Sequence, residues 1–232
     1  MAFLRISILL LALMPLASCL PPPFVCATAS TDDTLFIAIL GALMTVVNNA
    51  PGAGYAKSQN QGGVNAFGRC TGLHNGLSCG QCLANSAATL QKYCANYEDG
   101  AVWYNSCFLR YSTKDFFGDW NVQPLHAFFP SNDNSQSPLF EAAVLRLAVT
   151  VSNMAVQSGA NLFAEMEQPV QEISGVTIYI MAQCTQDLPS SQCQGCLDWL
   201  RNNIDSNCGN KDGCRLFHTS CILRYGISNF FI

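Results

Sequence analysis

Two pairs of cysteines have the spacing at which thiols can carry out redox chemistry or bind a metal ion. They are Cys79-x-x-Cys82 and Cys193-x-x-Cys196. In a redox dithiol the two sulfurs of one pair bond to each other, and their thiol pKa values are shifted. The two pairs together could instead supply four thiolates to a zinc ion. A further cysteine precedes each pair by eight intervening residues, at Cys70 and Cys184, and this addition is not typical of a redox site.

The whole cysteine pattern occurs twice. Cys184 lies 114 positions after Cys70, and the same offset relates Cys94 to Cys208 and Cys107 to Cys221. It also relates the segments Cys-Phe-Leu-Arg-Tyr and Cys-Ile-Leu-Arg-Tyr, and two later Phe-Phe pairs. Agreement at one offset over so many positions indicates an internal duplication, so we expect two homologous modules in tandem.

The first residues predict export from the cell. Arg5 precedes an apolar run of 12 residues, 6–17, and small residues follow at Ala17-Ser18-Cys19. This is the order of a secretory signal peptide, which we assign to residues 1–19. A membrane-spanning helix needs about 20 apolar residues. The later apolar stretch 35–47 is shorter and is expected to be a core helix, so no membrane insertion is expected.

Export decides between the possible roles of the cysteines. The chain has 13 cysteines, and removal of Cys19 with the signal peptide leaves an even number. Outside the cell thiols are oxidised, so an even count predicts a disulfide framework and not a redox or zinc site. We therefore expect neither a metal ion nor a cofactor.

The spacing also suggests the pairing. Two of the expected bridges close short loops, two join cysteines 25 residues apart, and Cys94 is left with Cys26 as its partner. In the second module no upstream cysteine is free, so Cys208 is expected to pair with Cys214, whose counterpart is Gly100. The predicted pairs are Cys26–Cys94, Cys70–Cys79, Cys82–Cys107, Cys184–Cys193, Cys196–Cys221 and Cys208–Cys214.

Other residues give no support for catalysis. His74, His126 and His218 have no histidine counterpart in the other module, and all three are expected on the surface or in loops. Acyl transfer needs a nucleophile, a base and an orienting group in contact, and no such set is repeated. The sparse carboxylates form no glycosidase-like pair. With a net charge of −4 and no basic patch, nucleic acid is also excluded as a partner.

An arginine–tyrosine pair follows the last cysteine of each module, at Arg110-Tyr111 and Arg224-Tyr225. Each arginine could be exposed beside a stacking aromatic residue and bind a sugar or a protein. Alternatively it could lie over the core at the end of a strand. Repetition in both modules favours the structural interpretation.

Hydrophobic periodicity predicts two helices and several antiparallel strands per module. We expect modules at 20–117 and 138–232, joined by a linker at 118–137. The expected buried faces of four helices are Phe36, Leu40, Leu43 and Val47; Leu83, Ala87, Leu90 and Cys94; Phe140, Val144, Leu147, Val151 and Met154; and Leu197, Leu200, Ile204 and Cys208. Segments 64–71, 102–111 and 176–183 are expected to form strands.

The tandem Cys-x8-Cys-x2-Cys pattern, Cys-x-x-Arg-Tyr and the terminal Phe-Phe resemble the plant cysteine-rich repeat secretory proteins. Their repeat, the ginkbilobin-homologous domain, also forms the ectodomains of cysteine-rich receptor-like kinases and plasmodesmata-located proteins. The resemblance implies an α+β fold with two disulfide-rich modules in tandem. Each module would have two helices packed on an antiparallel sheet of about five strands, a common sheet size.

The resemblance also suggests a ligand site. Ginkbilobin binds mannose through an asparagine, an arginine and a glutamate, and it has antifungal activity. By position the asparagine falls on Ala27, the arginine on Ala101 and Arg215, and the glutamate on Ser112 and Gly226. Only Arg215 keeps the residue type, and it is the candidate ligand-binding residue.

We therefore expect a secreted, non-enzymatic plant defence protein of the apoplast. It would be a lectin-like antifungal protein that binds cell-wall or fungal glycans. Two alternatives remain open. The protein could be a ligand or decoy for receptor ectodomains built from the same domain, or the ectodomain of a truncated receptor kinase or plasmodesmata-located protein.

Overall fold

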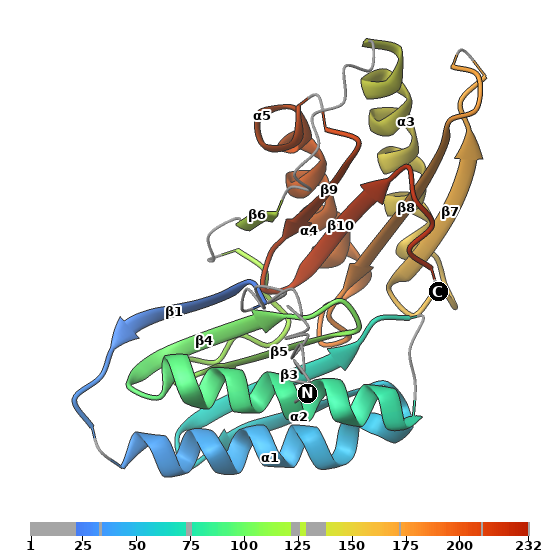
Figure 1. Cartoon of the computed structure of the whole chain (residues 1–232). Helices are drawn as coiled ribbons and strands as arrows, with labels where there is room; N and C mark the ends of the chain where they lie inside the picture. The colour runs from blue at the N-terminus through green and yellow to red at the C-terminus, as the bar shows by residue number, and fades with distance from the viewer. Residues whose placement is uncertain are drawn as a thin grey trace, which may run out of the picture.

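A computed structural model describes residues 22–32, 34–72, 76–121, 126–128, 138–171, 173–209 and 211–231. The expected signal peptide and His74 lie outside these residues. The described chain folds into two α+β modules, each with a five-stranded antiparallel sheet, as the resemblance implied. The second module lies against the helix-free side of the first, and both are visible in Figure 1.

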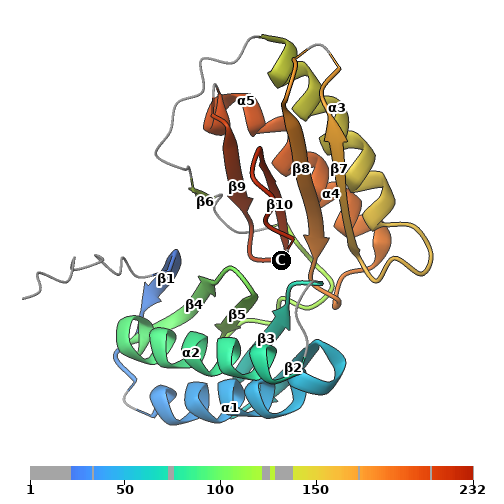
Figure 2. The same cartoon turned by 45° about the vertical axis from the view of Figure 1, so that its right-hand side comes forward.

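The first module has the sheet order β1-β4-β5-β3-β2, with two helices on one face. Its elements are β1 (Phe24–Ala29), α1 (Leu35–Ala53), β2 (Tyr55–Gln61), β3 (Val64–Cys70), α2 (Gly76–Cys94), β4 (Tyr97–Trp103) and β5 (Cys107–Ser112). Helix α1 continues through Pro51 and ends at Gly54, whose φ of 79° suits a residue without a side chain. The long helices α1 and α2 run side by side beneath the sheet (Figures 1 and 2).

The second module repeats this order as β6-β9-β10-β8-β7. Its elements are β6 (His126–Phe128), α3 (Pro138–Ala155), β7 (Phe163–Pro169), β8 (Thr177–Cys184), α4 (Ser190–Asn202), α5 (Ile204–Cys208), β9 (Gly213–Phe217) and β10 (Cys221–Gly226). Strand β6 lies inside the stretch 118–137 that we expected to be a linker, and it pairs with β9. Part of that stretch is therefore an edge strand of the second sheet.

The buried faces of α2, α4 and α5 are as expected, whereas those of α1 and α3 differ in part. In α2, all four residues of the expected face are buried, and the same holds across α4 and α5, although the helix breaks at Asn203. In α1, Phe36 is 38% exposed, and the buried stripe begins three residues later with Ile39, Leu43 and Val46. In α3, Leu147 is half-buried and Met154 is exposed, because Ala148 and Ala155 take the core positions.

The structure contains the six disulfides that the spacing suggested. They are Cys26–Cys94, Cys70–Cys79, Cys82–Cys107, Cys184–Cys193, Cys196–Cys221 and Cys208–Cys214. In each module two of these disulfides join the first turns of the second helix, α2 or α4, to neighbouring strands of the sheet. The Cys26–Cys94 bridge attaches the edge strand β1 to the end of α2.

Alternation along the strands gives each sheet two different faces. On β5, Leu109 and Tyr111 point to the helices, whereas Phe108 and Arg110 point to the other side. These helix-free faces meet between the modules in a shared apolar cluster of Phe67, Ala101, Trp103, Phe108, Met181, Phe217 and Ile222. Trp103 and Phe217, one from each module, have ring centroids 5.5 Å apart. The modules are therefore packed together through a core of their own.

Candidate functional site

A hollow of about 420 Å³ opens beside this contact, between the first sheet and the second module. We call it the inter-module pocket. Its floor comes from β1, β4 and β5, and one wall is the segment after β5. The other wall is Thr219 and Ser220, from the turn between β9 and β10. The remaining lining residues are Val25, Ala27, Thr28, Asp99, Gly100, Ala101, Arg110, Tyr111, Ser112, Lys114, Asp115, Phe116, Asp119, Trp120 and Asn121.

Close packing of β4 on β5 fixes the floor of this pocket. A Cβ at Gly100 would lie 2.6 Å from the ring of Tyr111, so only glycine fits there. The Tyr111 hydroxyl donates a hydrogen bond to the carbonyl of Cys94, the last residue of α2. Burial, together with the charge of Asp99, raises the pKa of Tyr111 above its usual value. The phenol therefore stays protonated and holds the sheet to the helix.

The polar groups around the pocket are held by local hydrogen bonds. Ser112 Oγ donates to Asp99 Oδ1 and accepts from the Lys114 amide. Asp115 and Asp119 cap the turns after β5 by accepting backbone N–H groups of Phe117 and Asn121. A carboxylate has about four acceptor positions, so each of these three aspartates keeps free lone pairs for a ligand.

Trp120 supplies the largest aromatic surface at the rim. It is half-buried, and its indole packs near Trp199 and against the edge of His218, with centroids 6.3 Å and 6.0 Å away. Gly195 on α4 admits this ring, because a Cβ there would lie 3.0 Å from the indole nitrogen. Residues of the second module thus position Trp120, which lies before β6, the first strand of that module, in the sequence.

Arg110 does not take either of the positions expected from the sequence. Its side chain is buried, its guanidinium lies 3.5 Å from the centroid of Phe116, and it donates a hydrogen bond to Ser220 Oγ. It also lies 3.8 Å from Asp187 Oδ2 of the second module. Burial lowers the pKa of Arg110 to about 10, against the opposing effect of Asp187. The residue is a buried link between the modules and neither an exposed ligand nor a residue at the edge of the core.

A second, smaller hollow of about 300 Å³ lies at the corresponding place on the second sheet. We call it the β9–β10 pocket. Its residues are Asp212, Gly213, Cys214, Arg215, Arg224, Tyr225, Gly226, Ile227, Ser228 and Phe230. Arg215, the candidate ligand-binding residue, lies on β9 and donates a hydrogen bond to Asn105 Oδ1 of the first module. Burial lowers the pKa of Arg215.

The positions carried over from ginkbilobin therefore fall into two hollows. Ala27, Ala101 and Ser112 all line the inter-module pocket, although none keeps the residue type of the mannose site. Arg215 and Gly226 line the β9–β10 pocket. The residues that give the first pocket its chemistry, Trp120 and the aspartates, were not predicted as site residues. A tryptophan and two aspartates within residues 115–120 were the available signal.

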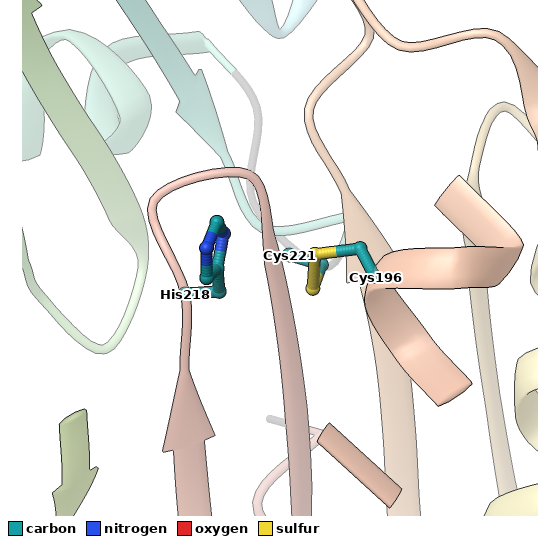
Figure 3. Close-up of side chains that lie close together, drawn as sticks. All are labelled: Cys196, His218 and Cys221. Carbon is teal, nitrogen blue, oxygen red and sulfur yellow. A yellow bond between two sulfur atoms is a disulfide. The ribbon is translucent and has the colours of Figure 1, made fainter. Parts of the chain in front are cut away.

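One group of side chains has the composition of a metal site. Potential ligand atoms of Cys196, His218 and Cys221 lie within 4.8 Å of one another. Figure 3 shows, however, that the two sulfurs are bonded to each other, so they cannot act as thiolate ligands. His218 is only 3% exposed, and its Nδ1 accepts the N–H of Ser220. His218 lies in the turn between β9 and β10, as expected of a loop residue, but it is not on the surface because Trp120 and Trp199 pack against its ring. His126 lies on β6.

Comparison with known proteins supports the assignment of the fold. The family model described as salt stress response/antifungal matches residues 25–114 and again 130–228. Cysteine-rich repeat secretory protein 38 of Arabidopsis thaliana is 29% identical over 86% of this chain and 80% of its own length. The antimicrobial ginkbilobin-2-like protein of Castanea crenata is 29% identical over 82% of this chain and 79% of its length.

A solved structure has the same two-module architecture. The tandem DUF26 ectodomain of the Arabidopsis thaliana cysteine-rich receptor-like protein PDLP8 superposes with a TM-score of 0.73. The match covers 90% of this chain and 99% of that one at 19% sequence identity, so it supports the fold alone. The resemblance to cysteine-rich repeat secretory proteins is confirmed by the family match and by these relatives. The chain belongs to the salt stress response/antifungal domain family and contains two copies of that domain in tandem.

Proposed function

We propose that the protein is a secreted, non-enzymatic carbohydrate-binding protein of the plant apoplast, with an antifungal, lectin-like role. The observation that supports this proposal is the inter-module pocket. It combines an aromatic rim at Phe116 and Trp120 with hydrogen-bonding groups within the same hollow. Its volume of about 420 Å³ lies in the range of about 300–1,000 Å³ typical of small-ligand sites.

The chemistry of the pocket suits a sugar ring. Each sugar hydroxyl both donates and accepts hydrogen bonds, so its site needs acceptors and donors together. Asp99, Asp115 and Asp119 are acceptors, whereas Lys114 and the Asn121 amide are donors. The accessible part of the half-buried Trp120 indole provides apolar area for the C–H face of the ring. A cell-wall or fungal glycan is therefore the proposed ligand.

Replacing Trp120 with alanine is expected to weaken glycan binding at least tenfold. The half-buried indole supplies aromatic surface at the rim, and loss of about 1.4 kcal/mol corresponds to a factor of ten. The measurement is calorimetric titration of the oxidised mature protein with a glycan selected from an array that includes mannan oligosaccharides.

Phe36→Ala is the matched control, because it removes an exposed aromatic side chain from α1, on the opposite side of the first sheet. It should leave the affinity unchanged. Unchanged affinity in Trp120→Ala, or an array without any bound glycan, would contradict the proposal. Circular dichroism of both variants checks that the fold is retained.

An exposed apolar helix face supports the second candidate function, binding to receptor ectodomains of the same domain type. Helix α1 has no charged residue, and it exposes Phe36, Ile37 and Met44. It is long and apolar enough to cross a membrane by length and composition, although five of its residues are buried in the core. Helix α3, its counterpart in the second module, also exposes Leu139, Val149 and Met154, but it carries the charged residues Glu141 and Arg146. Contiguous exposed apolar surface often marks a protein interface.

Ile37→Glu is expected to abolish capture of the protein by an immobilised tandem ectodomain of this family. Ile37 is 73% exposed, so the charge would not disturb the core but would oppose burial against a partner. Val149→Glu on α3 is the control, since it adds the same charge to a 40% exposed position of the other module. If both variants bind like the unchanged protein, α1 is not the contact.

A further inference from the structure

Two arginines are buried on the helix-free face of the first sheet, where it meets the second module. Arg69 on β3 is the register partner of Phe108, and Arg110 on β5 is the partner of Phe67, so the two arginines are diagonal neighbours on one face. Each is only 4% exposed. Burial lowers the pKa of Arg69 to about 9 and that of Arg110 to about 10, and both therefore remain protonated at neutral pH. The contact between the modules thus encloses two positive charges.

Asp187 supplies only part of the negative charge that these arginines require. Among the described residues, its carboxylate is the one group whose charge acts on Arg69 and Arg110. Glu165 on β7 also has a buried oxygen without a hydrogen bond, but burial alone raises its pKa and no arginine opposes that shift. Charged side chains are rarely buried without a partner. One carboxylate against two guanidinium groups leaves one buried positive charge without a counterion.

The hydrogen-bond donors of both arginines are also incompletely used. Arg110 Nη1 donates to Ser220 Oγ, but Arg110 Nε and Nη2 are buried and make no hydrogen bond within the part of the chain that the structure describes. These two nitrogens form one edge of the guanidinium, from which two parallel N–H groups can bind one ligand. The distance of 3.8 Å from Arg110 Nη2 to Asp187 Oδ2 is too long for a hydrogen bond. Arg69 Nε and Nη1 are buried without a described partner as well.

The inter-module pocket gives a small ligand access to this cluster. Arg110 lines the pocket together with Thr219, whose buried hydroxyl likewise makes no hydrogen bond to a described residue. Asp187 Oδ1 and Gln183 Oε1 are unused acceptors in the same region of the contact. Water molecules can join such donors to such acceptors. Water does not, however, neutralise the remaining positive charge, whereas an anion accepts the hydrogen bonds and also supplies the missing charge.

We propose that a small monovalent anion, for which chloride is the probe, binds between the modules at Arg69 and Arg110. One negative charge completes the neutralisation that Asp187 begins, and the free edge of Arg110 and the Thr219 hydroxyl donate hydrogen bonds to the ion. The arginines belong to the first module, whereas Thr219 and Asp187 belong to the second, so the bound anion stabilises the contact between them. The site does not require a glycan in the inter-module pocket, and either proposal can fail without the other.

The test compares thermal unfolding of the oxidised protein in sodium chloride and in sodium gluconate at equal ionic strength. Gluconate has the same charge as chloride but is too large for a buried site. A ligand that binds only the folded protein stabilises it, so we expect the Tm to be about 2–4 °C higher in chloride. Equal Tm values in the two salts would overturn the proposal.

Arg69→Gln should abolish the difference between the two salts, because it removes the positive charge that lacks a counterion. Glutamine already occupies the corresponding position of the second module, at Gln183 on β8, so this fold accepts it there. Arg146→Gln is the matched control, because it removes one exposed positive charge on α3 and should retain the full difference. A full difference in Arg69→Gln would show a general salt effect and overturn the proposal.

Diffraction from crystals of the unchanged protein grown in sodium bromide is a second measurement that needs no variant. Bromide has the charge of chloride and a strong anomalous signal. We expect an anomalous peak in contact with the guanidinium groups of Arg69 and Arg110. A site that holds water alone would overturn the proposal, whether or not Arg69→Gln folds.

Discussion

Replacing Asp187 with asparagine is expected to lower the free energy of unfolding by about 3–5 kcal/mol. The Asp187 side chain is 2% exposed and lies among two buried arginines, Arg110 and Arg69. Burial lowers the pKa of Arg69 to about 9, and the charge of Asp187 opposes that shift. Without the carboxylate, the two buried guanidinium groups would lose the counterion that faces them. The measurement is guanidinium-induced unfolding of the oxidised protein.

Asp198→Asn is the control for this prediction. Asp198 also pairs with an arginine, Arg201, at 3.2 Å, but both side chains are partly exposed on α4. Exposed pairs of this kind contribute about 0.2–1 kcal/mol, so the control should lose no more than that. Equal losses in the two variants would show that Asp187 is not the counterion of the buried arginines. Asp187 also accepts the N–H of Gly118, so its loss should loosen one wall of the inter-module pocket.

Removing the Cys26–Cys94 bridge by a double alanine substitution is expected to cost about 4 kcal/mol of stability. Removal of Cys208–Cys214 in the same way should cost about 2 kcal/mol. The two bridges close loops of 68 and 6 residues, and the entropy lost by the unfolded chain grows with the logarithm of loop length. Both variants are compared by thermal and denaturant unfolding.

The difference between the stability losses of these two variants is more informative than either loss alone. Each pair attaches the end of a helix to a strand, but one does so across most of the first module and the other within a short turn. Equal losses would show that local packing around the sulfurs, and not loop closure, determines their contribution. Alanine is chosen because serine would leave unpaired hydroxyls in the core.

The sequence predicted the parts of the fold that the repeat and the core determine. The constant offset led to the disulfide pairs, and the buried face of α2 followed from its period. The expected strand 102–111 was wrong in extent, because it contains the end of β4, a turn and most of β5. The strands β2 and β7, which were missed altogether, are edge strands. Strand β2 (YAKSQNQ) buries only Ser58, and β7 (FAEMEQP) buries only Ala164, so neither has the alternation of a half-buried strand. By contrast, β3 is buried along its whole length and was predicted.

The site was less predictable because it depends on how the modules pack. Arg215 came from the family resemblance, and its ligand remains a proposal. Asp187 is the counterion of Arg110 and Arg69, but both arginines lie in the other module, far from Asp187 in the sequence. Trp120 lies in an apolar stretch without periodicity. Only the orientation of one sheet against the other brings these residues together, and a single sequence contains no local signal for that orientation.

The shared aromatic cluster between the sheets means that neither half is an independent unit. Separated from its sibling, the first module would present Phe67, Trp103 and Phe108 to water, and the second would present Phe217 and Ile222. Each half on its own would therefore tend to self-associate. The contact faces of the two modules are thus constrained together, because a substitution on the contact face of one sheet must be matched by a substitution on the other. Shuffling single copies between relatives should yield insoluble chimaeras unless both contact faces are exchanged together.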